Sequence, residues 1–152
     1  MRLLMPVWLK SKRKREKTPL QKAVARFDRV FSLYIRLRDM IPKQKACRCI
    51  SCGRIVPTTR IDCGHYINRQ HMALRYSEMN CHAQCHDCNR YDEGNNSAYR
   101  NALVKMYGEN AVVMLEAQKY ATRKWTVPEI EIAIEFYKKE IKKLEEEKGT
   151  LL

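Results

Sequence analysis

The chain has 152 residues, a length that suits one domain or a small core domain with helical extensions. Its 30 Lys and Arg outnumber 17 Asp and Glu, for a formal net charge of +13, which favours a polyanionic partner such as nucleic acid. The apolar stretch at residues 3–9 is too short for a signal peptide or a membrane span. We therefore expect a cytoplasmic protein with no membrane partner.

A dense basic run, KSKRKREK, occupies residues 10–17. Blocks of like charge repel themselves, so residues 1–17 are predicted to form a flexible basic arm that contacts phosphates. The alternative is a tail that is merely solvated.

Residues 18–44 are predicted to hold one long helix. Thr18 and Pro19 have the residue types of a helix cap and a first helical position, and apolar residues follow at helical spacing. The pattern predicts a helix from Pro19 to Met40, with Pro42 beyond its end. Its polar side is rich in arginine, which suits either phosphate contacts or an ordinary solvated face.

Two Cys-x-x-Cys pairs stand in the middle of the chain, Cys49 with Cys52 and Cys85 with Cys88. Zinc favours four thiolates in a tetrahedron, and two separated pairs would pin the segment between them at both ends. In a reducing compartment disulfides are disfavoured, so a structural zinc site is the leading interpretation. Cys47 lies two residues before Cys49 and could compete for this site.

Polar residues framed by these pairs predict a catalytic centre within a nuclease core at residues 45–108. His65 can act as a general base, while Asp62 and Asn89 can offer oxygen ligands to a catalytic Mg²⁺ or Mn²⁺. Asn80 would bond the backbone and orient the loop that carries His65. The alternatives are a structural histidine, a turn aspartate and a helix-capping asparagine.

Helices are expected again in the last third of the chain. The core is predicted to close with a helix that stops at Gly108. Residues 109–152 are then predicted to form a helical extension, with one helix around residues 112–117. The last helix should begin at Thr126, because the sequence TVPE is a capping box with Pro in the first turn.

These motifs, in this order, resemble the bacteriophage NinG or Rap recombination endonucleases, a branch of the HNH or His-Me finger nucleases. The resemblance runs through FSLYIRLRD (31–39), CISCG (49–53), DCGHY (62–66), RY (75–76), NCHAQCHDCN (80–89), GN (94–95), YR (99–100) and LE (115–116). A run of separate motifs in order is far more specific than one Cys-x-x-Cys pair, which also occurs in non-catalytic zinc ribbons.

The resemblance implies a small zinc-stabilised ββα-metal core. We therefore predict an α+β fold, mostly helical, with helices flanking that core. It also implies an endonuclease for branched DNA, such as Holliday junctions and D-loops. Such an enzyme would act in phage recombination inside the bacterial host, with phage recombination proteins as possible partners. Cys63 departs from the small apolar residue that the family often has, and it could be a stray metal ligand or an oxidation-sensitive thiol.

Together, the residues and the resemblance suggest metal-assisted phosphodiester hydrolysis, with His65 activating water and leaving a 5′-phosphate and a 3′-hydroxyl. Arg69, Arg75 and Arg100 are candidates for contacts with backbone phosphates. Resolving a four-way junction takes two symmetric cuts, so a homodimer is plausible. The rival hypotheses are a non-catalytic zinc-binding DNA module and an HNH nuclease that acts on linear or single-stranded DNA.

Overall fold

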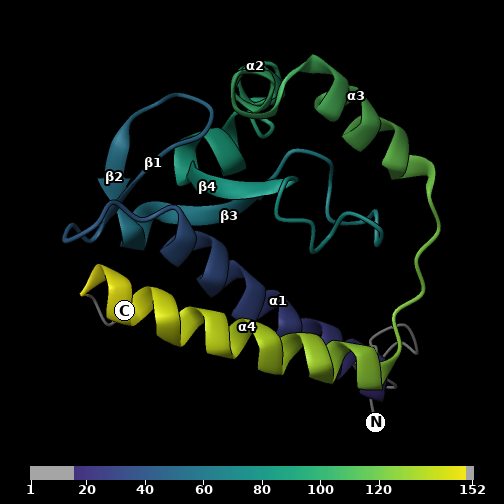
Figure 1. The fold of residues 1–152 in the computed structure, drawn as a ribbon. Coiled ribbons are helices and arrows are strands. Elements are labelled where there is room, and N and C mark those ends of the chain that lie inside the picture. The colour runs from purple at the N-terminus through teal and green to yellow at the C-terminus, as the bar shows by residue number, and fades with distance from the viewer. Residues whose placement is uncertain (1–15, 150–152) are drawn as a thin grey trace, which may run out of the picture.

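The structure is a computed structural model and describes residues 16–149. Most of the predicted basic arm, residues 1–15, lies outside the described residues. The described part is an α+β fold, mostly helical as predicted, with two small antiparallel sheets (Figure 1). One pairs β1 (Ala46–Arg48) with β2 (Ile55–Pro57), and the other pairs β3 (Ile61–His65) with β4 (Cys81–Cys85).

Four α-helices and three short helical turns complete the described part. None of these described helices is long and apolar enough to cross a membrane. The α-helices are α1 (Pro19–Arg38), α2 (Asn96–Tyr107), α3 (Glu109–Ala117) and α4 (Val127–Lys148), and the short turns are Thr58–Arg60, Asp87–Tyr91 and Gln118–Tyr120.

Both long helices start where the sequence predicts. The Thr18 hydroxyl accepts a hydrogen bond from the Gln21 backbone N–H, and the Thr126 hydroxyl accepts one from Glu129, so both caps are complete capping boxes. α2 also stops as predicted, with Gly108 following it at a φ of 85°.

The predicted end of the first helix at Met40 is wrong by two residues, since α1 ends at Arg38. Met40 instead forms an isolated antiparallel bridge with Cys47. The Asp39 carboxylate accepts a hydrogen bond from the Ala83 backbone N–H at 2.7 Å. Pairing with the strands therefore takes the chain out of the helix before Pro42 is reached.

The helices α1 and α4 run parallel and side by side (Figure 1). Arg26 and Glu131 form an ion pair near their starts, and Lys148 donates to the backbone oxygens of Arg38 and Met40 at their ends. The interface between the helices is apolar and rich in aromatic residues, including Phe27, Phe31, Ile35, Ile130 and Ile134. α4 thus shares an apolar core with α1.

The β3–β4 hairpin lies between the α1–α4 pair and the α2–α3 pair (Figure 1). On the α2 side, the Tyr99 hydroxyl donates to the Gly64 backbone oxygen at 3.1 Å. Gln84 packs over Gly64 so closely that a Cβ at position 64 would lie 2.7 Å from the Gln84 Cβ. Gly64 is therefore required for this hairpin to pack, although its backbone is not left-handed.

Candidate functional site

The two cysteine pairs come together at one end of the hairpin. The Sγ atoms of Cys49, Cys52, Cys85 and Cys88 all lie within 4.8 Å of one another, and all four thiols are free. The first pair is held by a tight turn in which the Gly53 N–H donates to the Cys49 backbone oxygen at 2.9 Å. A group of four thiols in this arrangement can hold a metal ion such as zinc.

Hydrogen-bond donors surround the sulfur atoms. Arg54 donates to the Cys52 sulfur at 3.4 Å and to the Cys85 sulfur at 3.7 Å, and Asn95 donates to the Cys88 sulfur at 3.6 Å. Burial alone would raise the pKa of Cys52, but the hydrogen bonds from Arg54, Cys49 and Cys88 together outweigh it and lower that pKa to about 6. These donors favour the thiolate at Cys52, the form that binds metal, whereas burial raises the pKa of Cys49 and raises that of Cys88 to about 12.

The sequence left open whether Cys47 or Cys63 joins a metal site, and the structure places these two cysteines differently. Cys47 is buried, and its thiol donates to the Arg36 backbone oxygen at 3.5 Å, outside the group of four. Cys63 lies in a separate group with His65 and Cys81, whose ligand atoms are within 4.8 Å of one another.

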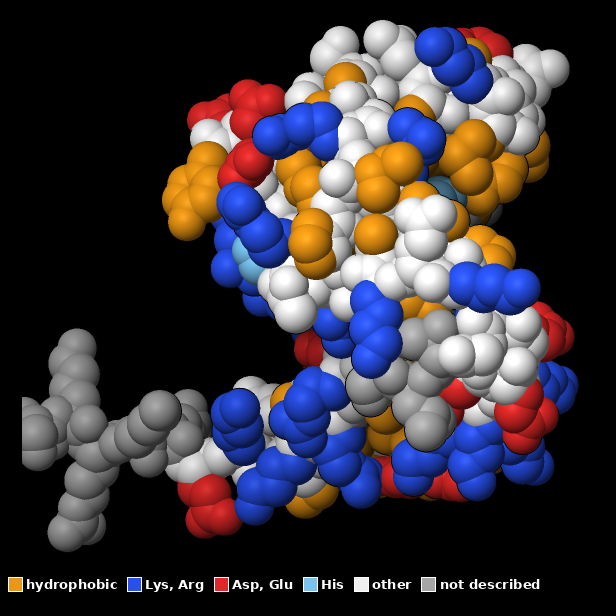
Figure 2. Space-filling view, turned by 90° about the vertical axis from the view of Figure 1, so that its left-hand side faces the viewer, with side chains coloured by type: hydrophobic (Ala, Val, Ile, Leu, Met, Phe, Trp, Pro, Cys, Tyr) orange, Lys and Arg blue, Asp and Glu red, His pale blue; other side chains and the backbone are white. Residues whose placement is uncertain are grey.

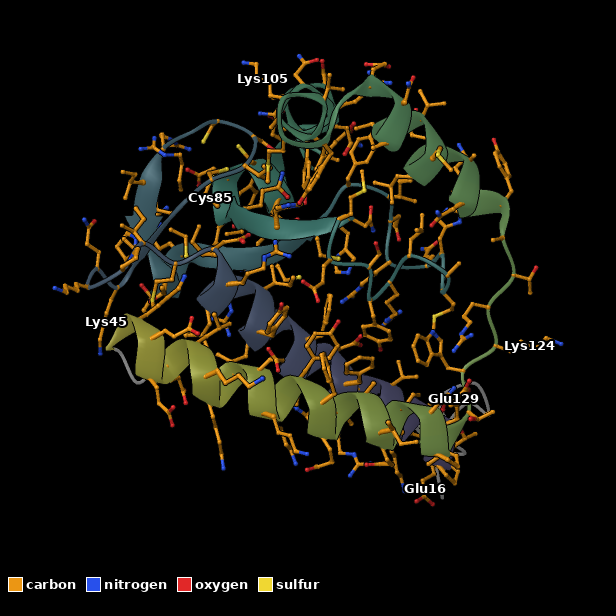
Figure 3. All side chains as sticks on the ribbon, viewed as in Figure 1. Glu16, Lys45, Cys85, Lys105, Lys124 and Glu129 are labelled. Carbon is orange, nitrogen blue, oxygen red and sulfur yellow. The ribbon has the colours of Figure 1, made fainter. Side chains whose placement is uncertain are left out.

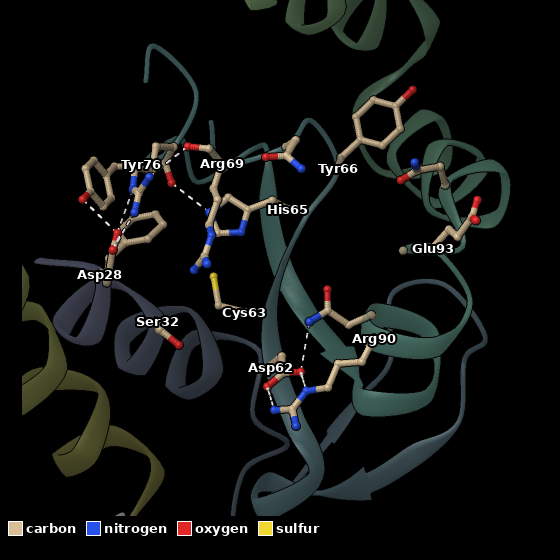
Figure 4. Close-up of a pocket in the computed structure, with 16 residues that line it drawn as sticks. Asp28, Ser32, Asp62, Cys63, His65, Tyr66, Arg69, Tyr76, Arg90 and Glu93 are labelled. Atoms are coloured by element: carbon tan, nitrogen blue, oxygen red, sulfur yellow. Dashed lines mark hydrogen bonds and ion pairs between the residues drawn. The ribbon is translucent and has the colours of Figure 1, made fainter. Parts of the chain in front are cut away.

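A pocket of about 560 Å³ lies beside β3 (Figure 4). β4 covers one edge of β3, and within residues 16–149 no strand covers the other. The pocket lining includes Asp62, His65 and Asn89, together with Arg69 and Arg90. Three of the four predicted catalytic residues thus share one cavity with three arginine side chains, those of Arg69, Arg75 and Arg90.

Asp62 and Asn89 are in direct contact. The Asn89 amide nitrogen donates to an Asp62 carboxylate oxygen at 2.9 Å, and Arg90 donates to both of these carboxylate oxygens at 2.7 Å. Burial would raise the pKa of Asp62, but the hydrogen bonds from Arg90 and Asn89 outweigh it and lower that pKa. The carboxylate is therefore ionised and already faces a cation.

His86 and Arg90 belong to this cluster and were not predicted from the sequence. The His86 Nε2 lies 3.4 Å from an Asp62 carboxylate oxygen. Both residues flank Asn89 closely in the chain, and the short turn Asp87–Tyr91 brings them to one side. The signal in the sequence was their nearness to Asn89, and only the turn geometry shows that both face Asp62.

His65 has the hydrogen bond that orients a general base. Its Nε2 lies 3.0 Å from the Arg75 backbone oxygen. A carbonyl oxygen only accepts, so Nε2 carries the proton and Nδ1 keeps a lone pair. Burial, with the positive charges of Arg69 and Arg75, lowers the pKa of His65. The ring is accordingly neutral near pH 7, as a base requires.

The structure does not bring His65 into contact with Asp62. Successive side chains on a strand point to opposite faces. Asp62 turns toward Asn89 and Arg90, whereas His65 lies with Cys63 farther along β3 (Figure 4). These residues share the pocket lining, at different positions along it.

Asn80 is fully buried, and its side chain bonds only the backbone. Its amide oxygen accepts from the Ile67 N–H at 2.8 Å, and its amide nitrogen donates to the backbone oxygens of Ile67 and Leu74 at 2.9 and 3.1 Å. These bonds hold the loop that follows His65, as the sequence suggested for Asn80, and its importance for catalysis stays a prediction.

Two of the three predicted phosphate-binding arginines are paired internally. Arg75 makes two hydrogen bonds to the Asp28 carboxylate, at 2.8 and 2.6 Å, and Arg100 bonds Glu109 and Glu116 at 2.5 and 2.8 Å. Both arginines therefore already neutralise carboxylates of the protein itself, which is a structural role.

Arg69 lines the pocket, is exposed, and makes no ion pair among residues 16–149. Of the three predicted phosphate contacts, the one at Arg69 has the strongest geometric support.

Positive charge is spread over the surface rather than confined to the pocket. Figure 2 shows Lys and Arg side chains gathered over the lower part of one face, at the level of α1 and α4, with acidic side chains among them. In Figure 3, Lys45, Lys105 and Lys124 lie at the margins of the molecule. This distribution suits contacts with a polyanion on more than one side.

Comparison with known families gives a clear match. The family model described as Bacteriophage Lambda NinG protein matches residues 8–147. The chain belongs to the NinG family. It is 33% identical over 112 residues to Protein ninG of Escherichia phage lambda, which is 73% of this chain and 52% of that protein. It is also 32% identical over 117 residues to Protein ninG of Salmonella phage P22, which is 76% of this chain and 54% of that protein.

This NinG-family chain therefore spans about half the length of the relatives that it matches. No solved structure matches its fold.

Proposed function

We propose that this NinG-family protein is a metal-dependent DNA endonuclease of the HNH or His-Me finger type. The observation that carries the proposal is the pocket beside β3, which combines a neutral imidazole, a carboxylate–amide pair and cationic side chains. The order of its elements, an antiparallel hairpin followed by the helical turn that carries Asn89, supports a ββα-metal core.

The four-cysteine group supports a structural zinc site. Four thiols within 4.8 Å, with donors aimed at three of the sulfur atoms, fit zinc in kind and number of ligands. Zinc there would join the β1–β2 hairpin to the end of β4 and to the turn that carries Asn89. It would thereby hold one side of the pocket in place.

Asp62 and Asn89 would hold the catalytic Mg²⁺ or Mn²⁺. Carboxylate and amide oxygens are hard ligands of the kind that these ions prefer. Arg90 now neutralises the Asp62 carboxylate, so this position in the pocket already favours a positive charge. The Arg90 side chain is 52% exposed and can move to a DNA phosphate when the ion binds. The ion would supply charge neutralisation at the scissile phosphate and the departing oxygen.

His65 would act as the base. Its Nδ1 takes a proton from water, the water oxygen bonds to phosphorus, and the bond from phosphorus to the 3′-oxygen breaks. The departing 3′-oxygen takes a proton from solvent water to become a hydroxyl, and the phosphate stays on the 5′ side. Arg69 would hold a neighbouring phosphate, and Asn80 keeps the loop after His65 in place.

The proposed substrate is branched DNA in phage recombination, such as Holliday junctions and D-loops. Support comes from the resemblance of the motifs and from the net charge of +13. Two symmetric cuts would require two active sites, so the proposal includes a homodimer and delivery by phage recombination proteins.

The rival function is a zinc-stabilised DNA-binding module without catalysis. The separation of His65 from Asp62 favours it, because a base and a metal site must act on the same phosphate. Under that alternative, His65 and Asn89 only support the fold.

The test is cleavage of a labelled four-way junction and a matched linear duplex, at low salt, with and without Mg²⁺ or Mn²⁺. We expect metal-dependent cutting of the junction, lost in His65→Ala and kept in His71→Ala, a partly exposed histidine outside the pocket. DNA affinity should be unchanged in both variants. Binding without cutting under every metal would leave the DNA-binding module as the function.

A further inference from the structure

Cys81 has no role in the proposed function, and the sequence left Cys63 as either a stray metal ligand or an oxidation-sensitive thiol. We propose that Cys63, His65 and Cys81 form a second site for a thiophilic metal ion such as zinc, separate from the four-cysteine group. The proposal rests first on geometry, since one ligand atom from each of the three residues lies within 4.8 Å of the other two.

The hairpin register explains why these side chains meet. His65 is directly opposite Cys81 across the β3–β4 pair, and Cys63 is two residues before His65 on the same face of β3. Residues in such direct and diagonal positions are close enough for side-chain contact. The site is therefore built on paired strands rather than on a loop.

The ligand set selects the kind of metal. Two thiolates and one imidazole bind zinc with a fourth position left for water or another ligand, whereas Mg²⁺ prefers oxygen ligands. The Nε2 proton of His65 is held by the Arg75 backbone oxygen at 3.0 Å, which fixes the ring as metal-bound histidines are usually fixed. Nδ1 is then the nitrogen that would bind the ion, in place of the contact of this ring with the Cys63 backbone.

The site is reachable from the pocket. Cys63 and His65 line it, and Cys81 is buried behind them at 0% exposure. A metal ion entering through the pocket would meet the two accessible ligands first and would displace the thiol protons as it binds. The fourth ligand position would then face the pocket.

Occupation of this site would block the base. This consequence rests on the proposed function, because the lone pair of His65 cannot bind a metal and also take a proton from water. Zinc at low concentration is therefore expected to inhibit cleavage that depends on Mg²⁺ or Mn²⁺, while zinc in the four-cysteine group supports the fold.

The test counts zinc and does not need catalysis. The reduced full chain is incubated with excess zinc, desalted, and measured by native mass spectrometry, next to Cys63→Ala and to Cys47→Ala as the matched control. We expect about two ions per chain in the wild type and in Cys47→Ala, and about one in Cys63→Ala, since loss of a ligand should weaken the second site roughly 100-fold or more. Cys63 is partly exposed, so its substitution should leave the fold intact, and circular dichroism checks this.

Cobalt gives an independent readout. Loading with Co²⁺ should give thiolate charge-transfer absorption, and this absorption should be smaller in Cys63→Ala than in the wild type. In His65→Ala the visible bands of the bound Co²⁺ should change. One ion per chain in the wild type, or equal counts in the wild type and Cys63→Ala, would overturn the second site. If no protein cleaves DNA but the ion counts differ as expected, the proposed nuclease fails and the metal site stands.

Discussion

The two ends of the β3–β4 hairpin differ in how their polar residues are organised. At the end near Cys85, four ligands from two segments converge within 4.8 Å. Along the pocket, Asp62 and Asn89 touch each other, while His65 lies with Cys63 and Cys81. A short-range spacing such as Cys-x-x-Cys therefore specifies a local cluster, whereas residues on opposite faces of a strand need substrate or metal to work together.

The largest expected effect comes from Cys52→Ala. Cys52 is exposed, so without a metal its substitution should change stability very little. If zinc joins the four cysteines, the variant should lose more than about 4 kcal/mol of stability, because structural zinc contributes on the order of 10 kcal/mol. Urea unfolding of the zinc-loaded proteins measures this difference. A variant as stable as the wild type would show that the group is not a structural metal site.

Asn80→Ala should cause the second-largest loss of stability. The substitution leaves three buried backbone groups, on Ile67 and Leu74, without their partner, and we expect a loss of about 3 kcal/mol. Asn89→Ala is the matched control at the other asparagine, which is only partly buried, and it should cost less than about 1 kcal/mol. Equal losses for the two asparagines, measured by thermal or urea unfolding, would contradict the different roles assigned to them.

A smaller effect than that of Asn80→Ala is expected from Asp28→Asn, which weakens the ion pair with Arg75 in the lining of the pocket. Burial raises the pKa of Asp28, but the hydrogen bonds from Arg75 and Tyr76 outweigh it and lower that pKa. We expect a loss of about 1–2 kcal/mol at pH 7. Glu131→Gln, at an exposed pair with Arg26, should cost less than about 0.5 kcal/mol.

The pH dependence follows from the direction of the Asp28 shift. A lowered pKa means that the carboxylate stabilises the fold above its unfolded value of about 3.9, and this contribution disappears as the pH falls through the folded value. The difference between the wild type and Asp28→Asn should therefore be the same at pH 7 and pH 5. A difference that shrinks between these values would show that the carboxyl pKa is raised instead.

The helix caps and the grouping of the two Cys-x-x-Cys pairs were the most predictable features. The capping boxes at Thr18 and Thr126 and the stop at Gly108 depend on residues close together in the chain. The two-residue error at the end of α1 arose because Met40 pairs with Cys47 across a turn, a contact with no local signal. The parallel packing of α4 on α1 was likewise invisible, since it depends on which apolar stripes meet.

The candidate site was predictable in its residues and less so in its geometry. The sequence pointed to Asp62, Asn89 and His65, but not to the faces that they occupy. The pairing of Arg75 with Asp28 joins residues 47 positions apart, so its structural role could not be foreseen. The same holds for the group of Cys63 with Cys81, which depends on strand register.

The most direct test of the central claim is a single-turnover measurement of junction cleavage with Mn²⁺ at low salt, comparing wild type, His65→Ala and His71→Ala. We predict a rate at least about 100-fold lower in His65→Ala, as expected for loss of a general base, and an unchanged rate in His71→Ala. A His65→Ala rate equal to that of the wild type, at equal DNA affinity, would contradict the assignment of His65 as the catalytic base.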